Sequence, residues 1–298
     1  MQKRSYNPSK INLQKVGLVI ILLILFSLLI NAFSASLFFR SKDRITTVFY
    51  NEKTRLYSFG EANYSLYFYP DLKIFVPGGY GNYRVGGLGK LVSLENKPVL
   101  LKNAFSAASS TFVDYYFYPK KEIIYYGKNK DKSLQFPGFQ ELFFYESNTS
   151  FLDRLYLYSK FLTAKKADFT QLEAPNNKSE DKNVEIFDQE NFAKTYQGYF
   201  YQKTYRNEKA NVQILYYKSY DTAQLIGHIL DSTGIRVVDL SQDDRKIKGC
   251  LVIKQKSENS STASSLADFF KCELKIGKTN ASDIILELGQ REAEWSVD

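Results

Sequence analysis

Apolar residues form one long uninterrupted run near the N-terminus. Residues 16–39 read VGLVIILLILFSLLINAFSASLFF and contain no charged side chain. About 20 apolar residues are needed to cross the hydrocarbon core of a bilayer, so this run predicts a single transmembrane helix. No later stretch is apolar for long enough to span again. A cleaved signal peptide is the alternative, because Ser34, Ala35 and Ser36 offer small residues near the end of the run.

The charges that precede this run predict the orientation of the chain. Residues 1–15 carry Lys3, Arg4, Lys10 and Lys15 and no acidic residue. Because basic flanks stay on the cytoplasmic side, residues 1–15 are expected to form a cytoplasmic tail. The protein is then expected at the cell membrane, with its body outside the cytoplasm.

Residues 40–206 alternate between strand and helix patterns. Residues 150–162 and 188–201 show the apolar spacing of helices, with Ser150 and Asp188 as their expected N-caps. A glycine-rich loop at 77–83 leads into a predicted short helix at 85–94. Short runs of β-branched and aromatic residues predict strands at 46–50, 64–69, 72–76, 112–118 and 122–126.

Residues 207–298 predict the order strand, helix, strand, strand, helix, strand, which is typical of a compact α/β sandwich. The first helix has Asp221 as its expected N-cap and stops at Gly234. The elements are 212–217, 221–233, 235–240, 250–253, 261–270 and 283–288. The expected fold class is therefore α/β (α+β): one N-terminal transmembrane helix, a mixed α/β domain over 40–206 and a small C-terminal α/β sandwich over 207–298.

The net positive charge of the chain narrows the classes of partner that it is expected to bind. The chain has 40 Lys and Arg against 32 Asp and Glu, a formal charge of +8. This excess suits a protein held against an anionic membrane or an anionic polymer, although an AT-rich genome also enriches Lys. No Arg-rich helix, zinc-finger spacing or aromatic RNA-binding signature accompanies the charge, so nucleic acid is not an expected partner. With one His in the chain, no metal site and no cofactor are predicted.

Two cations accompany the glycine-rich stretch 77–89, one within it and one directly after it. Backbone amides of such a loop, at Gly78 and Gly79, can hold a phosphate when cations lie beside them. Arg84 and Lys90 are such cations, so these four residues form the candidate phosphate or polymer site. The alternative is a turn-rich sheet edge with solvated charges.

Cys250 and Cys272 are the only cysteines, and both lie in the C-terminal region. A helix that packs on the sheet after the strand of Cys250 can return its end beside that strand, which would bring the pair within disulfide reach. An extracytoplasmic location would let the bond persist. The alternative is two buried free thiols that pack as small apolar residues.

The C-terminal region contains a series of short motifs in a fixed order. They are Glu208 and the stretches 212–215 (VQIL), 222–226 (TAQLI), 233–237 (TGIRV) and 282–289 (SDIILELG). In these residues the region resembles the C-terminal domain of LytR cell-envelope proteins. Tyr216 and Tyr217 stand where that family usually has Asn-Gly.

Residues 40–206 resemble the LytR-CpsA-Psr catalytic domain in the stretches 76–79 (VPGG), 112–116 (FVDYY) and 151–155 (FLDRL). The resemblance implies enzymes that move glycopolymers from a lipid carrier onto the cell wall, using an Arg-Asp signature. The matching stretch here, 57–61 (YSFGE), contains no Arg-Asp pair, so no catalytic residue is predicted.

The expected function is therefore that of a non-catalytic, membrane-anchored cell-envelope protein. It would bind an anionic wall polymer, a lipid-linked glycan with its polyprenyl-phosphate, or an envelope partner. One alternative is an active phosphotransferase that ligates glycopolymers from a polyprenyl-pyrophosphate carrier to the wall. The other is a purely structural scaffold.

Overall fold

The computed structural model describes residues 42–128, 133–178, 185–244, 247–255, 259–279 and 281–297, together with 26, 27, 30 and 36–39. The expected cytoplasmic tail at 1–15 and most of the expected transmembrane helix at 16–39 lie outside these residues. Within the described residues, no helix combines the length and apolar character needed to span a bilayer.

A six-stranded mixed sheet forms the centre of the body. Its strands, in spatial order, are β7 (Glu146–Ser147), β6 (Tyr115–Tyr118), β1 (Ile45–Phe49), β2 (Arg55–Phe59), β3 (Asn63–Tyr67) and β8 (Phe169–Leu172). Strands β1, β2 and β3 form an antiparallel meander, while β6 runs parallel to β1 and β8 parallel to β3. All five residues of β1 and of β2 are buried, because both faces of the sheet are covered.

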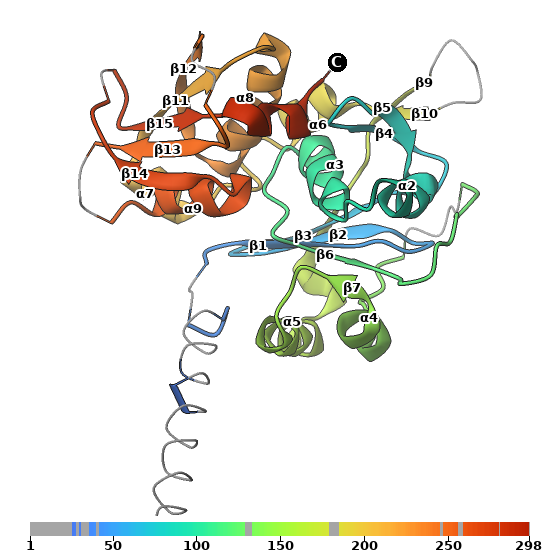
Figure 1. The fold of residues 1–298 in the computed structure, drawn as a ribbon. Helices are drawn as coiled ribbons and strands as arrows, with labels where there is room; N and C mark the ends of the chain where they lie inside the picture. Colours follow the sequence, from blue (N-terminus) through green and yellow to red (C-terminus); the bar gives the residue numbers. More distant parts are fainter. Residues whose placement is uncertain are drawn as a thin grey trace, which may run out of the picture.

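Successive side chains of the central strands pack into two different cores. On one face, Phe49 and Tyr57 pack with Leu157 and Phe161 under the helices α4 (Phe139–Phe144) and α5 (Phe151–Thr163). On the other face, Val48 packs beneath the helices α2 (Leu88–Glu95) and α3 (Val99–Ser109). Figure 1 shows the sheet between these two helical layers.

A small second sheet lies on the α2–α3 side, in the order β5 (Gly81–Arg84), β4 (Lys73–Val76), β10 (Glu185–Phe187) and β9 (Asn176–Lys178). Strands β4 and β5 form a hairpin whose turn contains Gly78 and Gly79, with φ of 91° and 83°. Side chains other than glycine rarely adopt this conformation, which explains the glycine pair. The helix α6 (Gln189–Thr195) follows β10.

The C-terminal residues build a separate five-stranded sheet. Its order is β12 (Arg236–Gln242), β11 (Asn211–Tyr216), β15 (Ile284–Glu287), β13 (Leu251–Lys254) and β14 (Glu273–Ile276), with the helices α7 (Lys203–Glu208), α8 (Tyr220–Thr233) and α9 (Ser261–Phe270). The 3₁₀ segment η3 (Gly289–Trp295) ends the described chain. The core of this part also contains Ala107 and Phe112, so it packs against the end of α3. The predicted domain boundary between residues 206 and 207 falls inside α7.

The mixed α/β class is confirmed, and several predicted elements need correction. Residues 122–126 form no strand, and Gly81–Arg84 is a strand that overlaps the end of the loop predicted at 77–83. Helix α6 ends at Thr195 rather than 201, although Asp188 caps it as predicted by accepting from Asn191 N–H. The N-cap of α8 is Ser219, and Asp221 lies in the first turn.

Candidate functional site

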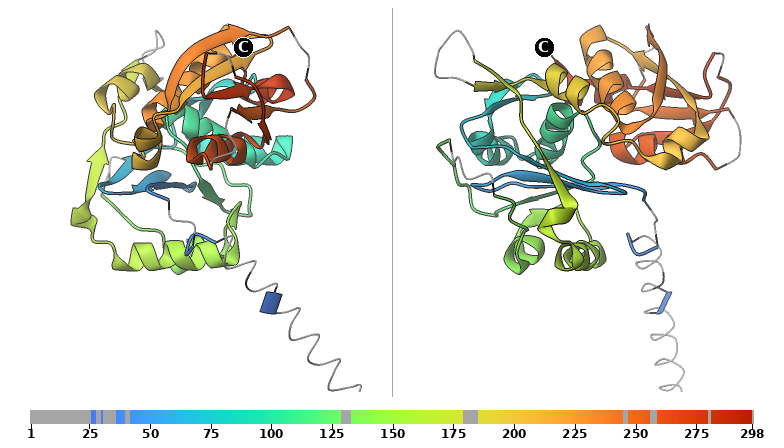
Figure 2. Two further views of the ribbon diagram at one scale, coloured as in Figure 1. Left: turned by 90° about the vertical axis from the view of Figure 1, so that its left-hand side faces the viewer. Right: turned by 180° about the vertical axis from the view of Figure 1, so that it is seen from behind.

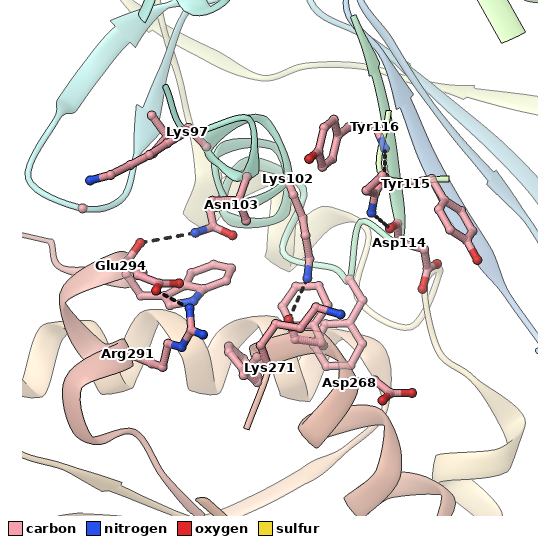
Figure 3. Close-up of a pocket in the computed structure, with 18 of the residues that line it drawn as sticks. Lys97, Lys102, Asn103, Asp114, Tyr115, Tyr116, Asp268, Lys271, Arg291 and Glu294 are labelled. Atoms are coloured by element: carbon pink, nitrogen blue, oxygen red, sulfur yellow. Dashed lines mark hydrogen bonds and ion pairs between the residues drawn. The ribbon is translucent and has the colours of Figure 1, made fainter. Parts of the chain in front are cut away.

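A cavity of about 760 Å³ lies between the first part of the body and the C-terminal part. The helix α3 supplies one wall, and the end of α9 together with η3 supplies the facing wall (Figure 3). Eight charged side chains line it: Lys42, Lys97, Lys102, Lys271, Arg291, Asp114, Asp268 and Glu294. Five cations against three carboxylates make the lining electropositive.

Lys102 is the unusual residue of this lining. Every residue of α3 from Leu100 to Ser109 is buried, and Lys102 is only 8% exposed. Its Nζ donates to the backbone oxygen of Phe269 at 2.7 Å and lies 3.7 Å from the centroid of the Phe269 ring. The ammonium therefore depends on one carbonyl and one aromatic face in place of bulk water.

The surroundings make the charged form of Lys102 costly. Burial, followed by repulsion from Lys271 and from Lys42, lowers the pKa of Lys102 from 10.5 to about 7. Asp114 and Glu294 oppose this shift without cancelling it. Lys102 is thus poised to gain a proton when a negative charge enters the cavity.

The other cations divide into paired and unpaired groups. Lys42 forms an ion pair with Asp114 at 2.7 Å, and the attraction of Asp114 raises the pKa of Lys42. Arg291 pairs with Glu294. Among the described residues Lys97 and Lys271 form no ion pair, and Figure 3 shows the Lys271 side chain reaching toward Lys102.

Aromatic rings line the other part of the cavity. Phe112 stacks on Phe269 with ring centroids 4.1 Å apart, and Trp295 lies 5.9 Å from the same ring. Tyr205, which is buried, also faces the cavity, and its burial raises the pKa of its hydroxyl to about 12. Cations beside apolar aromatic faces suit a ligand with both anionic and non-polar surfaces.

Of the four residues in the predicted phosphate loop, the structure places only Gly78 in this lining. Arg84 lies over the Tyr126 ring at 4.3 Å and is 3.5 Å from Asp71. Lys90 pairs with Glu122. The two predicted cations are therefore held by separate carboxylates, and Gly79 serves the β4–β5 turn.

Cys250 and Cys272 are joined by a disulfide with Cα atoms 4.6 Å apart. Cys250 precedes β13, and Cys272 follows α9, so the bond ties the C-terminal end of α9 to the sheet. The oxidising compartment that such a bond requires stays a prediction.

The stretch 57–61 forms the end of β2 and the turn after it. The stretch has no arginine of its own, but the side chain of Arg44 lies against it. Arg44 Nη1 donates to Ser58 Oγ at 3.0 Å and to the Ala62 carbonyl at 3.2 Å. Burial lowers the pKa of Arg44. Glu61 pairs with Lys203 on the surface. Within the described residues, no group of three or more His, Cys, Asp or Glu side chains is placed to hold a metal ion.

The sequence contained one signal that points to the cavity. Lys102 and Asn103 are the only strongly polar residues in the otherwise apolar or small run 98–108. A Lys in such a run is buried or paired in a special way, because desolvation of its charge is costly. Asn103 also faces the cavity wall, where its Nδ2 donates to the Glu294 carbonyl at 3.3 Å.

LytR-CpsA-Psr proteins are among the structural neighbours of the chain, as the sequence resemblance predicts. The family protein YwtF (TagT), solved with bound octaprenyl pyrophosphate lipid, is 11% identical, and the match covers 65% of this chain and 92% of that one at a TM-score of 0.35. TagT from B. subtilis is 12% identical over 52% of this chain and 88% of its own, with a TM-score of 0.33. A transcriptional regulator from Enterococcus faecalis is 7% identical, and the match covers 66% of this chain and 89% of that one at a TM-score of 0.34.

No family model matches the sequence, and no curated protein matches it. With TM-scores below 0.5 and identities below 25%, these structural likenesses assign no function to the chain.

Proposed function

We propose that this chain is a membrane-anchored, non-catalytic cell-envelope protein that binds a phosphate-bearing wall polymer or lipid-linked glycan in the cavity between α3 and η3. The observation that carries the proposal is Lys102. A buried ammonium that shares its cavity with Lys271 and Lys97 is destabilised without an anion and stabilised with one.

A bound phosphodiester would relieve two unfavourable features together. Its oxygens would accept charge-assisted hydrogen bonds from Lys102 and Lys271, which repel each other in the free protein. Sugar or glycerol units of the polymer would pack on the rings of Phe112 and Trp295. The sequence resemblance of residues 40–206 and 207–298 to LytR-type envelope proteins supports this class of ligand over other polyanions.

Calorimetric titration of the detergent-solubilised full chain with poly(glycerol phosphate) tests the proposal. Lys102→Met is expected to weaken binding by about tenfold or more, the loss of one charge-assisted hydrogen bond. Lys194→Met removes the same charge from a side chain that is 79% exposed on α6 and should bind like the wild type. Equal affinity of all three proteins, or no binding by the wild type, would contradict the proposal.

The rival function is an active phosphotransferase. We expect no turnover of a polyprenyl-pyrophosphate-linked glycan by the full chain with magnesium, because the Arg-Asp signature is absent from 57–61. Turnover above blank that requires magnesium would establish the rival instead.

A further inference from the structure

The outer surface of the α4–α5 layer carries an unusual set of exposed apolar side chains. We call the following five residues the α4–α5 face: Phe139 (54% exposed), Phe144 (72%), Phe151 (66%), Leu155 (36%) and Leu162 (66%). Single exposed apolar residues are common on soluble proteins, but a cluster of large ones on one layer marks an interaction surface.

Helix α5 is apolar on two opposite sides. Its inner side buries Leu157 and Phe161 against the sheet. Phe151, Leu155 and Leu162 recur at intervals of four and seven residues, so they form a second stripe along the outer side. A helix that only covers a core needs one apolar stripe, so the outer stripe calls for another apolar partner.

Ring contacts make the surface continuous across the two helices. Phe143 lies 4.5 Å from Phe139 on α4, and 5.6 Å from Tyr158 and 6.2 Å from Phe151 on α5, measured between ring centroids. The aromatic side chains of both helices therefore form one contiguous patch.

The end of the apolar N-terminal run packs directly against α5. Leu37 N–H donates to Asp153 Oδ1 at 2.8 Å, and the rings of Phe38 and Tyr156 lie 5.2 Å apart. Phe39 is itself 67% exposed. In Figures 1 and 2 the described N-terminal pieces, coloured blue, lie on the α4–α5 side of the central sheet.

Basic side chains accompany the patch. Lys160 lies in the last turn of α5, and Lys165 and Lys166 follow the helix end; all three are exposed. Apolar aromatic side chains with lysines at their border match the chemistry of an anionic bilayer surface, where apolar groups enter the acyl boundary and lysines meet lipid phosphates.

From the contact of the N-terminal run with α5, the outer stripe and the bordering lysines, we propose that the α4–α5 face lies in the interfacial layer of an anionic lipid bilayer. The bilayer would hold the body in a fixed orientation beside its anchor. This proposal goes beyond the proposed function, since it needs no ligand in the cavity.

Quenching of tryptophan by brominated phospholipids tests this orientation. The only Trp, Trp295, is replaced by Phe, and a reporter is introduced in the full chain as Phe144→Trp. The matched control is Leu94→Trp, a position that is 68% exposed on α2, across the central sheet from α4 and α5. Both variants are reconstituted in vesicles that contain brominated phosphatidylcholine and phosphatidylglycerol, and far-ultraviolet circular dichroism checks their fold.

The Phe144→Trp reporter is expected to lose most of its emission, while the Leu94→Trp reporter keeps its emission. Lys165→Glu together with Lys166→Glu should reduce the quenching of the first reporter in these anionic vesicles. Equal quenching of both reporters, or none at Phe144→Trp, would overturn the proposal. An unquenched Phe144→Trp reporter in a chain that sediments as a dimer would assign the face to a second copy instead.

Discussion

Replacing Lys102 by Met should change how the stability of the protein depends on pH, in a direction set by the burial of Lys102. The unfolded chain protonates this lysine below about pH 10.4, whereas the folded chain does so only below about 7. Between these values the unfolded state binds more protons, so the free energy of unfolding rises with pH. Below pH 7 both states are protonated, and the buried charge destabilises the fold by its full amount.

The magnitude follows from the size of the pKa shift. One pKa unit corresponds to about 1.4 kcal/mol, so the whole shift of Lys102 amounts to roughly 5 kcal/mol as an upper limit. About 2 kcal/mol of this falls between roughly pH 6 and pH 8.5, where proteins can be compared conveniently. Met keeps most of the side-chain volume but leaves the Phe269 carbonyl without its donor, which costs about 1 kcal/mol at every pH.

Urea unfolding of the detergent-solubilised full chain, followed by the fluorescence of Trp295, measures the effect. The free energy of unfolding of the wild type minus that of Lys102→Met should rise by about 2 kcal/mol over this pH range. Lys42, Asp114 and the other charged groups near the site are present in both proteins, so their titration largely cancels. Lys194→Met serves as the control and should differ from the wild type by a constant amount. A constant difference for Lys102→Met would refute the reasoning, because it would mean that the Lys102 ammonium is hydrated.

Other parts of the chain make three further predictions. Protease added to intact spheroplasts should digest the body, because the basic residues 1–15 predict an outward orientation; full protection would reverse the assignment. Replacing Cys250 and Cys272 together by Ser removes a disulfide between residues 22 positions apart and should lower the free energy of unfolding by about 3 kcal/mol. If a reductant leaves the free energy of unfolding of the wild type unchanged, the two cysteines are free thiols. Glu292→Gln should lower the free energy of unfolding by about 2–3 kcal/mol in urea titrations, because this buried carboxylate accepts from three consecutive backbone N–H groups before α8. Glu190→Gln, at an exposed position, is the control and should leave the free energy of unfolding unchanged.

Most of the C-terminal elements could be predicted because they carry their own local signals. Ser260 accepts from Ala263 N–H at the start of α9, and Gly234, with φ of 95°, ends α8. Strand β14 has no comparable signal, since all four of its side chains are exposed and its sequence ELKI has no strong β-branched content. Its place at the sheet edge is determined by pairing with β13.

Helix α3 and the cavity that it lines could not be predicted from local sequence patterns. The helix is buried on all sides, and a short apolar run of this kind does not distinguish helix from strand. The acceptor of Lys102 lies 167 positions away in the sequence, on a carbonyl that only the folded C-terminal part brings near. The predicted cations Arg84 and Lys90 do lie near a glycine turn. Arg84 is paired with Asp71 and Lys90 with Glu122, and the sequence spacing gave no indication of these ion pairs.

The two proposals concern opposite sides of the central sheet. The α4–α5 face lies on one side of that sheet, and α3 with its cavity lies on the other (Figure 1). If the α4–α5 face rests on the bilayer, helix α3 lies across the central sheet from the lipid, but the cavity also borders that sheet at Tyr115 and Tyr116 of β6 and is lined by Lys42. Lys42 follows Phe39, at the end of the apolar N-terminal run, by three residues, so the cavity lining begins within about 11 Å of that run along the chain. The orientation on the bilayer is therefore compatible with both a wall polymer and a lipid-linked phosphate in the cavity, and competition between poly(glycerol phosphate) and polyprenyl phosphate in the same vesicles would decide which of the two binds more tightly.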